Sequence, residues 1–253
     1  MELMRDDADY LCLSHIMTRR LVGREHRMNE KAESFYRFIR NLARKGKPLR
    51  VLIIGANSDG EIPKAEEEAR ELESQMKSEL KCMGMTEDTI TLTGSDLTLD
   101  NVRSILASGC HILHYAGHGL YAEEKPESSA LVLGTSYEEV LDATKLSRLL
   151  ADTELRFVFL SCCLGACNSF ENTQSDFRGI LSAMAMAGVP RILAQRWVLF
   201  DESALYFARS FYRSLWSSLS PDRALWEARN RVHGELGRDD ATWLSPLLLS
   251  QSY

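Results

Sequence analysis

Short apolar runs separated by helical segments limit the fold of this chain more than any other feature. The runs VLIIGAN (51–57) and FVFLS (157–161) are almost continuously apolar, which is typical of strands buried on both faces of a sheet. Further strands are predicted at 89–92, 111–116, 191–196 and 246–250, with a hairpin or edge strand at 130–134. Helical patterns lie between them, at 63–83, 97–109, 142–152, 177–188, 201–216 and 220–236. This alternation predicts an α/β fold with a mainly parallel sheet covered by helices on both faces.

The first 47 residues form a segment of a different kind. Apolar residues recur at helical spacing over 35–42, and glycine and proline follow them. We therefore predict a helical N-terminal extension over 1–47, followed by one α/β domain over 48–253. Residues 1–50 carry 12 Lys and Arg against 7 Asp and Glu. This basic surplus predicts either an acidic partner or simply a solvated helical face.

Charge and composition argue against several classes of function. A formal net charge of -6 gives no support to a nucleic-acid-binding surface. No stretch approaches the ~18 consecutive apolar residues of a transmembrane helix, and the residues after Met1 are charged rather than apolar. Six cysteines without an export signal predict reduced thiols. We expect a cytoplasmic protein that binds neither nucleic acid nor membrane directly.

Two of the predicted strands end in reactive residues. The strand at 111–116 is followed by Gly117-His118-Gly119, and the strand at 157–161 by Cys162-Cys163. The carboxyl ends of parallel strands meet at one edge of a sheet, so both tips are expected there if the strands are neighbours. An imidazole beside a thiol takes its proton or stabilises the thiolate, and it later protonates a leaving amine. Glycines beside the histidine leave room for substrate, and their N–H groups can face an oxyanion.

These motifs resemble the CHAT domain, a branch of the caspase–separase group of cysteine peptidases. His114–Gly119 (HYAGHG) is similar to the histidine motif of that family, and Leu160–Cys163 (LSCC) to its cysteine motif. Further segments in the same order resemble other parts of the family, namely IPKAEEEARELE, SSALVLG, MAGVPRILAQRW, FYRSL and TWLSPLLLS. The resemblance covers residues 50–253. It implies a caspase-like three-layer sandwich with a mainly parallel central sheet.

The resemblance also implies the roles of the site residues. Cys163 falls at the nucleophile, and His118 at the general base and acid. The N–H groups of Gly119 and Cys163 would hold the oxyanion. Cys162 falls where the family often has alanine, so no catalytic role is expected for it. Neither a metal nor an organic cofactor is implied, and the substrate would be a protein.

Substrate-binding residues are less strongly indicated. Ser161, two residues before the nucleophile, falls where caspase-like relatives place a residue that contacts P1, the residue preceding the scissile bond. Relatives that cut after Arg or Lys tend to carry aspartate there, so a neutral serine argues against a basic P1 residue unless an acid comes from elsewhere. Arg196 falls in a cleft-lining region. Candidate acids are Asp176, Asp201 and Glu202.

Regulation is a further implication of the resemblance. CHAT proteases resemble components of bacterial defence and cell-death systems that a partner, a sensor domain or an upstream protease switches on. The polar loop CNSFENTQSDF (167–177) is a candidate for a mobile or cleavable element. The alternative is a catalytically silent caspase-like scaffold that binds a partner protein, for instance through residues 1–47.

Other readings of the histidines and cysteines are weaker. His111 and His114 are interpreted as sheet residues with satisfied hydrogen bonds, and Cys12, Cys82 and Cys110 as buried small residues. The spacing of the histidines and of the cysteines near 162–167 does not match a common zinc motif. The stretch GANSDGE (55–61) lacks the G-K-[ST] ending of a phosphate-binding loop.

Overall fold

A computed structural model of the chain describes residues 10–20, 33–57, 60–120, 122, 125, 128–135, 139–163, 179–197 and 201–251. Its strands are β1 (Arg19–Arg20), β2 (Leu49–Gly55), β3 (Glu87–Thr93), β4 (Ile112–Ala116), β5 (Gly119–Leu120), β6 (Ala130–Val132), β7 (Val140–Asp142), β8 (Phe157–Cys163), β9 (Arg191–Gln195) and β10 (Pro246–Ser250). Its α-helices are α1 (Leu11–Ser14), α2 (Phe35–Arg44), α3 (Pro63–Cys82), α4 (Leu99–Ala107), α5 (Ala143–Leu150), α6 (Ile180–Met186), α7 (Asp201–Ser218) and α8 (Pro221–Leu236). Short 3-10 helices lie at Gly94–Asp96 and Ala241–Trp243. Each strand and helix predicted after residue 47 is present, with ends that differ by at most three residues.

The central sheet has seven strands in the order β1-β10-β9-β8-β4-β2-β3. Strand β10 runs antiparallel to β9, and the other neighbouring strands are parallel. The prediction of a mainly parallel sheet is therefore confirmed. Strands β5, β6 and β7 form a separate antiparallel sheet of three strands, which accounts for the short apolar run predicted at 130–134.

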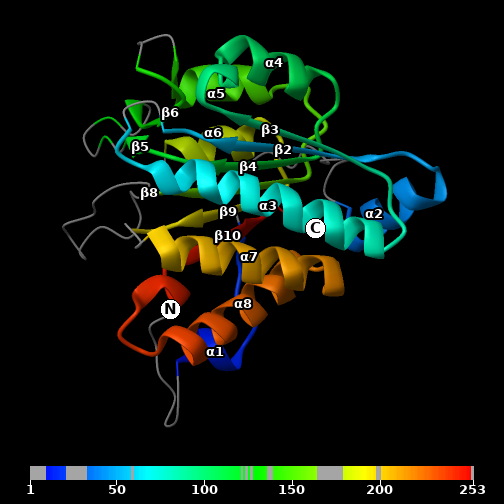
Figure 1. Cartoon of the computed structure of the whole chain (residues 1–253), viewed down its shortest axis with the longest axis vertical. Coiled ribbons are helices and arrows are strands. Elements are labelled where there is room, and N and C mark those ends of the chain that lie inside the picture. Colours follow the sequence, from blue (N-terminus) through cyan, green and yellow to red (C-terminus); the bar gives the residue numbers. More distant parts are fainter. Residues whose placement is uncertain are drawn as a thin grey trace.

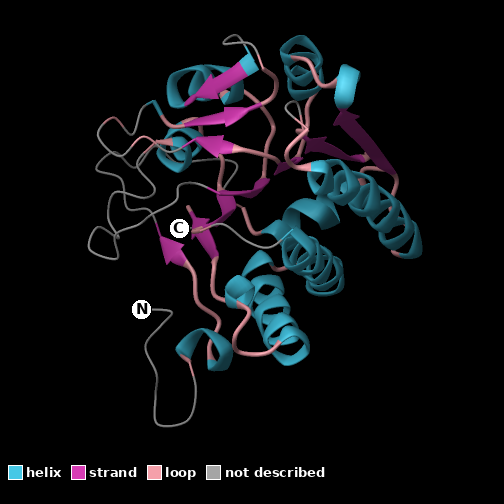
Figure 2. Cartoon of the chain, turned by 60° about the vertical axis from the view of Figure 1, so that its left-hand side comes forward, coloured by secondary structure: helices cyan, strands magenta, loops and turns pink. Residues whose placement is uncertain are grey.

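Helices cover both faces of the central sheet, as Figures 1 and 2 show. Successive side chains of a strand point to opposite faces. Val51 and Ile53 of β2 accordingly pack against residues of α2, α3, α7 and α8, whereas Leu52 and Ile54 pack against residues of α4, α5 and α6. Two apolar cores result, one on each side, so strands buried on both faces read as nearly continuous apolar runs.

The described part of the N-terminal segment joins the same fold. Phe35 and Phe38 of α2 and Cys12 and Leu13 of α1 lie in one of the two cores. The predicted helix over residues 1–47 is wrong at Arg19–Arg20, because β1 pairs in parallel with β10. The edge of β10 presents backbone groups that need a partner, and a strand supplies one where a helix does not. The division of the chain at residue 47 stays a prediction.

The predictions for three of the cysteines are partly confirmed. Cys12 and Cys110 are buried as predicted, and burial raises the pKa of the Cys110 thiol to about 12. Cys82, predicted to be buried, is exposed. It is the last residue of α3 and lies beyond Leu80, the last buried position of that helix.

Candidate active site

The loop that carries His118 follows directly from β4. Gly117 provides the space for this loop, because a Cβ atom there would lie 2.8 Å from both the Ala56 Cβ and the Tyr115 hydroxyl. The Tyr115 hydroxyl lies 2.8 Å from the carbonyl oxygen of His118, and the Val132 N–H donates to that same carbonyl at 3.1 Å. Contacts with residues of β4 and β6 therefore hold the backbone of His118. The side chain of His118 is half-buried.

Cys163 comes to the same edge of the sheet from the neighbouring strand. Strands β4 and β8 are paired in parallel, with Ala116 opposite Ser161, and the Gly117 N–H donates to the Ser161 carbonyl at 3.4 Å. The sequence predicted that the strand ends at residue 161, but β8 continues to Cys163, which pairs with Gln195 of β9 after an irregularity in register. The side chain of Cys163 lies outside the described part of the chain.

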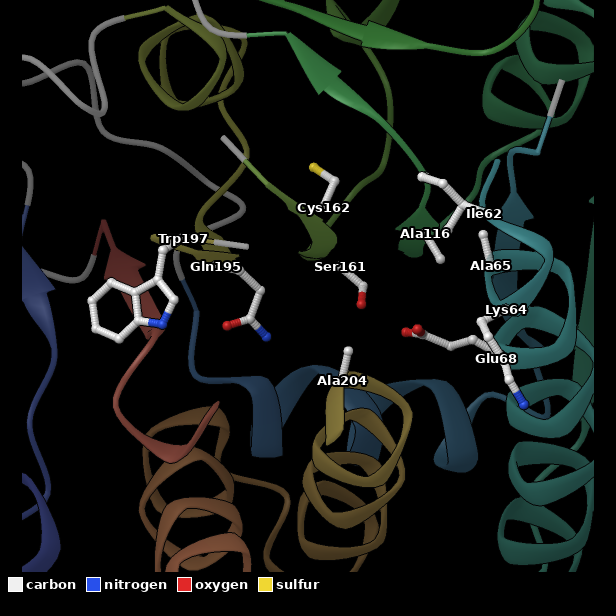
Figure 3. Close-up of a pocket in the computed structure, with 11 residues that line it drawn as sticks. Ile62, Lys64, Ala65, Glu68, Ala116, Ser161, Cys162, Gln195, Trp197 and Ala204 are labelled. Carbon is white, nitrogen blue, oxygen red and sulfur yellow. The ribbon is translucent and has the colours of Figure 1, made fainter. Parts of the chain in front are cut away.

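A pocket opens beside this edge (Figure 3). It lies between the carboxyl ends of β4, β8 and β9 and the helices α3 and α7, and it is lined by Ile62, Lys64, Ala65, Glu68, Ala116, Gly117, Ser161, Cys162, Gln195, Trp197 and Ala204. In Figure 3 the Ser161 hydroxyl, the Gln195 amide and the Glu68 carboxylate point into one space above Ala204. The pocket adjoins the proposed nucleophile, because Cys162 and Ser161 directly precede it in the chain.

Helix α3 brings Glu68 to this pocket. The helix packs closely on β2 because Gly55 has no side chain, and a Cβ atom there would lie 2.6 Å from the Ala65 carbonyl oxygen. Glu68 is only 5% exposed. Its Oε1 lies 3.0 Å from His114 Nε2, and His114 Nδ1 lies 3.2 Å from the Tyr212 hydroxyl. Burial, followed by the nearby Glu68 charge, raises the pKa of Tyr212 well above its usual value.

His111 and His114 have structural partners, as the sequence predicted. His114 is held in the network just described. His111 precedes β4, its Nδ1 accepts the Arg50 N–H at 3.0 Å, and its Nε2 lies 3.4 Å from Glu154. Burial lowers the pKa of His111, and the nearby Glu154 carboxylate partly offsets that effect. Among the described residues, no group of three His, Cys, Asp or Glu side chains is placed to hold a metal ion.

The predicted substrate-binding residues have different positions. Ser161 lines the pocket. Arg196 does not belong to its lining: its guanidinium group donates to the carbonyl oxygens of Ser245 and Leu244, and it lies 5.0 Å from the centre of the Trp197 ring. Asp201 begins α7, but its side chain lies outside the described part, as do Asp176 and the loop 167–177. Glu202 is exposed on α7.

Sequence reasoning missed Glu68 and Gln195. A signal for Glu68 was nevertheless present, because it interrupts the apolar stripe of Ala65, Leu72 and Met76 on the buried face of α3. A carboxylate on such a face is rarely buried without a partner or a function. Gln195 ends an apolar strand, and only its place beside β8 reveals that it faces the pocket.

The comparisons agree with this architecture. A mainly parallel sheet between two helical layers, with the candidate site at the carboxyl edge, is the caspase-like α/β fold. The chain belongs to the CHAT domain family, whose model matches residues 16–248. A search among curated proteins finds no match. Among the described helices, none has the length and apolar character that crossing a bilayer requires.

Solved structures show the same fold at low identity. Separase, in the Saccharomyces cerevisiae separase–securin complex, matches with a TM-score of 0.51 and 10% identity, covering 96% of this chain and 13% of that chain. The Arg-specific cysteine proteinase gingipain R matches with a TM-score of 0.50 and 15% identity, covering 80% and 46%. The complex of the pro- and mature domains of RgpB from Porphyromonas gingivalis gives 0.51 and 14%, covering 88% and 48%. The chain thus spans less than half the length of each of these three chains.

Proposed function

We propose that the chain is a cysteine endopeptidase in which Cys163 is the nucleophile and His118 is the general base and acid. The observation that carries this proposal is the pairing of Ala116 with Ser161 across β4 and β8. His118 and Cys163 each follow one member of that pair by two residues. The matched position of the two residues at one sheet edge, beside a pocket, is what an imidazole-assisted thiol requires.

The proposed reaction has two stages. His118 accepts the Cys163 proton, and the thiolate attacks the scissile carbonyl carbon to form a carbon–sulfur bond. The carbonyl oxygen becomes an oxyanion that accepts hydrogen bonds from the N–H groups of Gly119 and Cys163. Collapse of this intermediate breaks the carbon–nitrogen bond while His118 gives its proton to the leaving amine. Water then hydrolyses the thioester and restores the thiol, and no metal or organic cofactor takes part.

The pocket supplies a site for the P1 side chain in this proposal. Ser161 lines it and is the proposed substrate-contacting residue of β8. Arg196 is proposed to act indirectly, because it lies over Trp197 and is bonded to the backbone at residues 244 and 245. Asp201 remains a substrate-binding candidate from the sequence alone.

Peptide cleavage by paired cysteine variants tests the proposal. The full chain is incubated with a mixed peptide library, and new termini are counted by mass spectrometry. We expect Cys163→Ala to reduce cleavage to background, whereas Cys162→Ala, which removes the neighbouring thiol, retains activity within a few-fold. Cleavage that survives in Cys163→Ala would exclude this nucleophile. If Cys163→Ala also loses the effect that the protein has in cells, the result favours the protease. If the variant retains that effect, the result favours the partner-binding scaffold.

We further propose that the protease is regulated and works in the cytoplasm, in a bacterial defence or cell-death system. Membership of the CHAT family supports this. Separase is solved with securin, and RgpB with its pro-domain, which supports a protein partner as the regulator. A sensor domain or an upstream protease is proposed as the regulator from the family resemblance alone. The loop 167–177 is the proposed mobile or cleavable element. A loop that stays uncut and equally protected from added protease in resting and activated protein would refute that part.

A further inference from the structure

The polar lining of the pocket indicates which kind of side chain can bind there. His118 and Cys163 alone do not specify that side chain. Gln195 is only 2% exposed, and within the described part of the chain neither Oε1 nor Nε2 of its amide has a hydrogen-bond partner. Buried amides are normally hydrogen-bonded, because a donor or acceptor removed from water is costly without a partner. The Gln195 amide faces the pocket together with the Ser161 hydroxyl (Figure 3). A group that enters the pocket would therefore meet acceptors on at least two sides.

Glu68 adds a charge to this lining. Its Oε1 lies 3.0 Å from His114 Nε2, and its carboxylate points into the pocket (Figure 3). One protonation pattern satisfies the whole network: Tyr212 donates to His114 Nδ1, and His114 Nε2–H donates to Glu68. In that pattern the Glu68 carboxylate is an acceptor and each ring nitrogen of His114 has a partner. His114 and Tyr212 are thus positioning residues that fix the direction of the Glu68 carboxylate.

The nearby cations do not cancel this charge within the pocket. Lys64 also lines the pocket, but its side chain is 37% exposed and its Nζ lies 2.7 Å from Glu67 Oε2. Arg196 directs its guanidinium group to backbone carbonyls. Glu68 is therefore the buried charge of the lining, and it repels an acidic side chain.

We propose that this pocket selects a basic P1 residue through Glu68, an inference that rests on the proposed function. A guanidinium group carries five N–H donors in a planar fork, and the pocket offers the Glu68 carboxylate, Gln195 Oε1 and Ser161 Oγ as acceptors. The sequence had suggested Asp176, Asp201 or Glu202 as the source of an acid. The structure instead assigns this part to Glu68, which α3 delivers from almost 100 residues before the nucleophile.

The test compares two small probes that differ in charge and hardly in shape. Butylguanidine and butylurea are titrated into the full chain, and binding is followed by NMR. We expect butylguanidine to bind at least about tenfold more tightly, because charge-assisted hydrogen bonds are stronger than neutral ones. Equal binding of the two probes, or tighter binding of the urea, would overturn the inference, and this comparison needs no variant to fold.

A variant then assigns the preference to one residue. Glu68→Gln should abolish the tenfold preference and leave the affinity for butylurea within twofold. Glu71→Gln, which alters a surface glutamate of the same helix that pairs with Arg209, should leave the preference intact. A preference that survives in folded Glu68→Gln would exclude Glu68 as its source. Both probes should bind Cys163→Ala as they bind the wild type, because the probes do not need the nucleophile. A wild-type chain that cleaves no peptide but retains the preference for butylguanidine would refute the protease proposal and leave the pocket inference intact.

Discussion

Ala116 and Ser161 lie opposite each other on parallel strands β4 and β8, and each precedes one member of the proposed dyad by two residues. The hydrogen bond from Gly117 N–H to the Ser161 carbonyl extends this register beyond the strand β4. The relative position of His118 and Cys163 therefore depends on sheet pairing, which is more rigid than contacts between two loops. Changes that disturb the β4 end should act on the thiol chemistry without unfolding the domain.

The first prediction concerns the reactivity of Cys163. Its alkylation by iodoacetamide, resolved by mass spectrometry between pH 5 and 9, should be at least about tenfold faster below pH 7 than that of exposed Cys82, because a nearby imidazole increases the thiolate fraction. His118→Ala should remove this lead, and the exposed surface change His15→Ala should not. Buried Cys110, with a pKa of about 12, should be the slow reference. If Cys163 reacts no faster than Cys82, the chain as isolated holds no thiolate–imidazole pair.

Tyr115→Phe tests the anchoring of the histidine loop. The Tyr115 hydroxyl lies 2.8 Å from the His118 carbonyl and 2.7 Å from the Val132 carbonyl, and it accepts the Val132 N–H at 3.2 Å. Its removal should lower the free energy of unfolding by about 1–2 kcal/mol, since the ring stays in place while buried polar groups lose a partner. The alkylation rate of Cys163 should fall several-fold as His118 gains freedom. Tyr36→Phe, on an exposed tyrosine of α2, should change neither quantity in urea unfolding and labelling.

Gly117→Ala tests the need for glycine before the histidine. An added Cβ would lie 2.8 Å from the Ala56 Cβ and 3.0 Å from its carbonyl oxygen, so the loop must shift. We expect a loss of about 1–3 kcal/mol in the free energy of unfolding, as for other overpacked sites, and a slower labelling of Cys163. Gly234→Ala is the matched control, because an added Cβ on helix α8 meets nothing within 4 Å apart from its chain neighbours and the backbone of its own helix. That change should stabilise the chain slightly, and a Gly117→Ala protein as stable and reactive as wild type would show that the turn tolerates a side chain.

Much of the fold was predictable because its strands are buried on both faces. Short, continuous apolar runs such as those of β2 and β8 can form few structures other than buried strands. The glycines beside His118 and the position of Cys163 after an apolar run could also be recognised in the sequence. Arg19–Arg20 was not, because a strand of two charged residues owes its conformation to the edge of β10 rather than to its own pattern.

The wall of the pocket was much less predictable than the positions of His118 and Cys163 at one edge of the sheet. Glu68, Ser161 and Gln195 come from α3, β8 and β9, and their convergence depends on strand order and on the close approach of α3 at Gly55. Neither property is encoded in local periodicity. Strand β8 also continues past residue 161 only because Cys163 pairs with Gln195 across an irregular register. The features that the sequence did not predict are therefore those that depend on contacts between segments far apart in the chain.

The last prediction concerns the acid stability of the fold. His111 is 6% exposed, it packs at 5.2 Å against the Phe38 ring, and its Nδ1 accepts the Arg50 N–H. Burial lowers the pKa of His111 in the folded chain, although the Glu154 carboxylate opposes the effect. The unfolded chain, with an ordinary histidine pKa of about 6.5, then binds a proton that the folded chain does not. The contribution of neutral His111 to the free energy of unfolding is therefore complete above about pH 6.5. It is lost as the pH falls below the histidine pKa of the unfolded chain.

Urea unfolding at pH 7.5 and 5.5 measures this contribution. Each site of this kind costs at most about 1.4 kcal/mol per pH unit below its unfolded pKa. His111→Asn keeps an acceptor for the Arg50 N–H but cannot bind the proton, so the loss of stability between the two pH values should be smaller than in the wild type. His15→Asn, on an exposed histidine, should leave the wild-type loss unchanged. An identical loss in His111→Asn would mean that His111 takes up its proton equally well in the folded and unfolded chain.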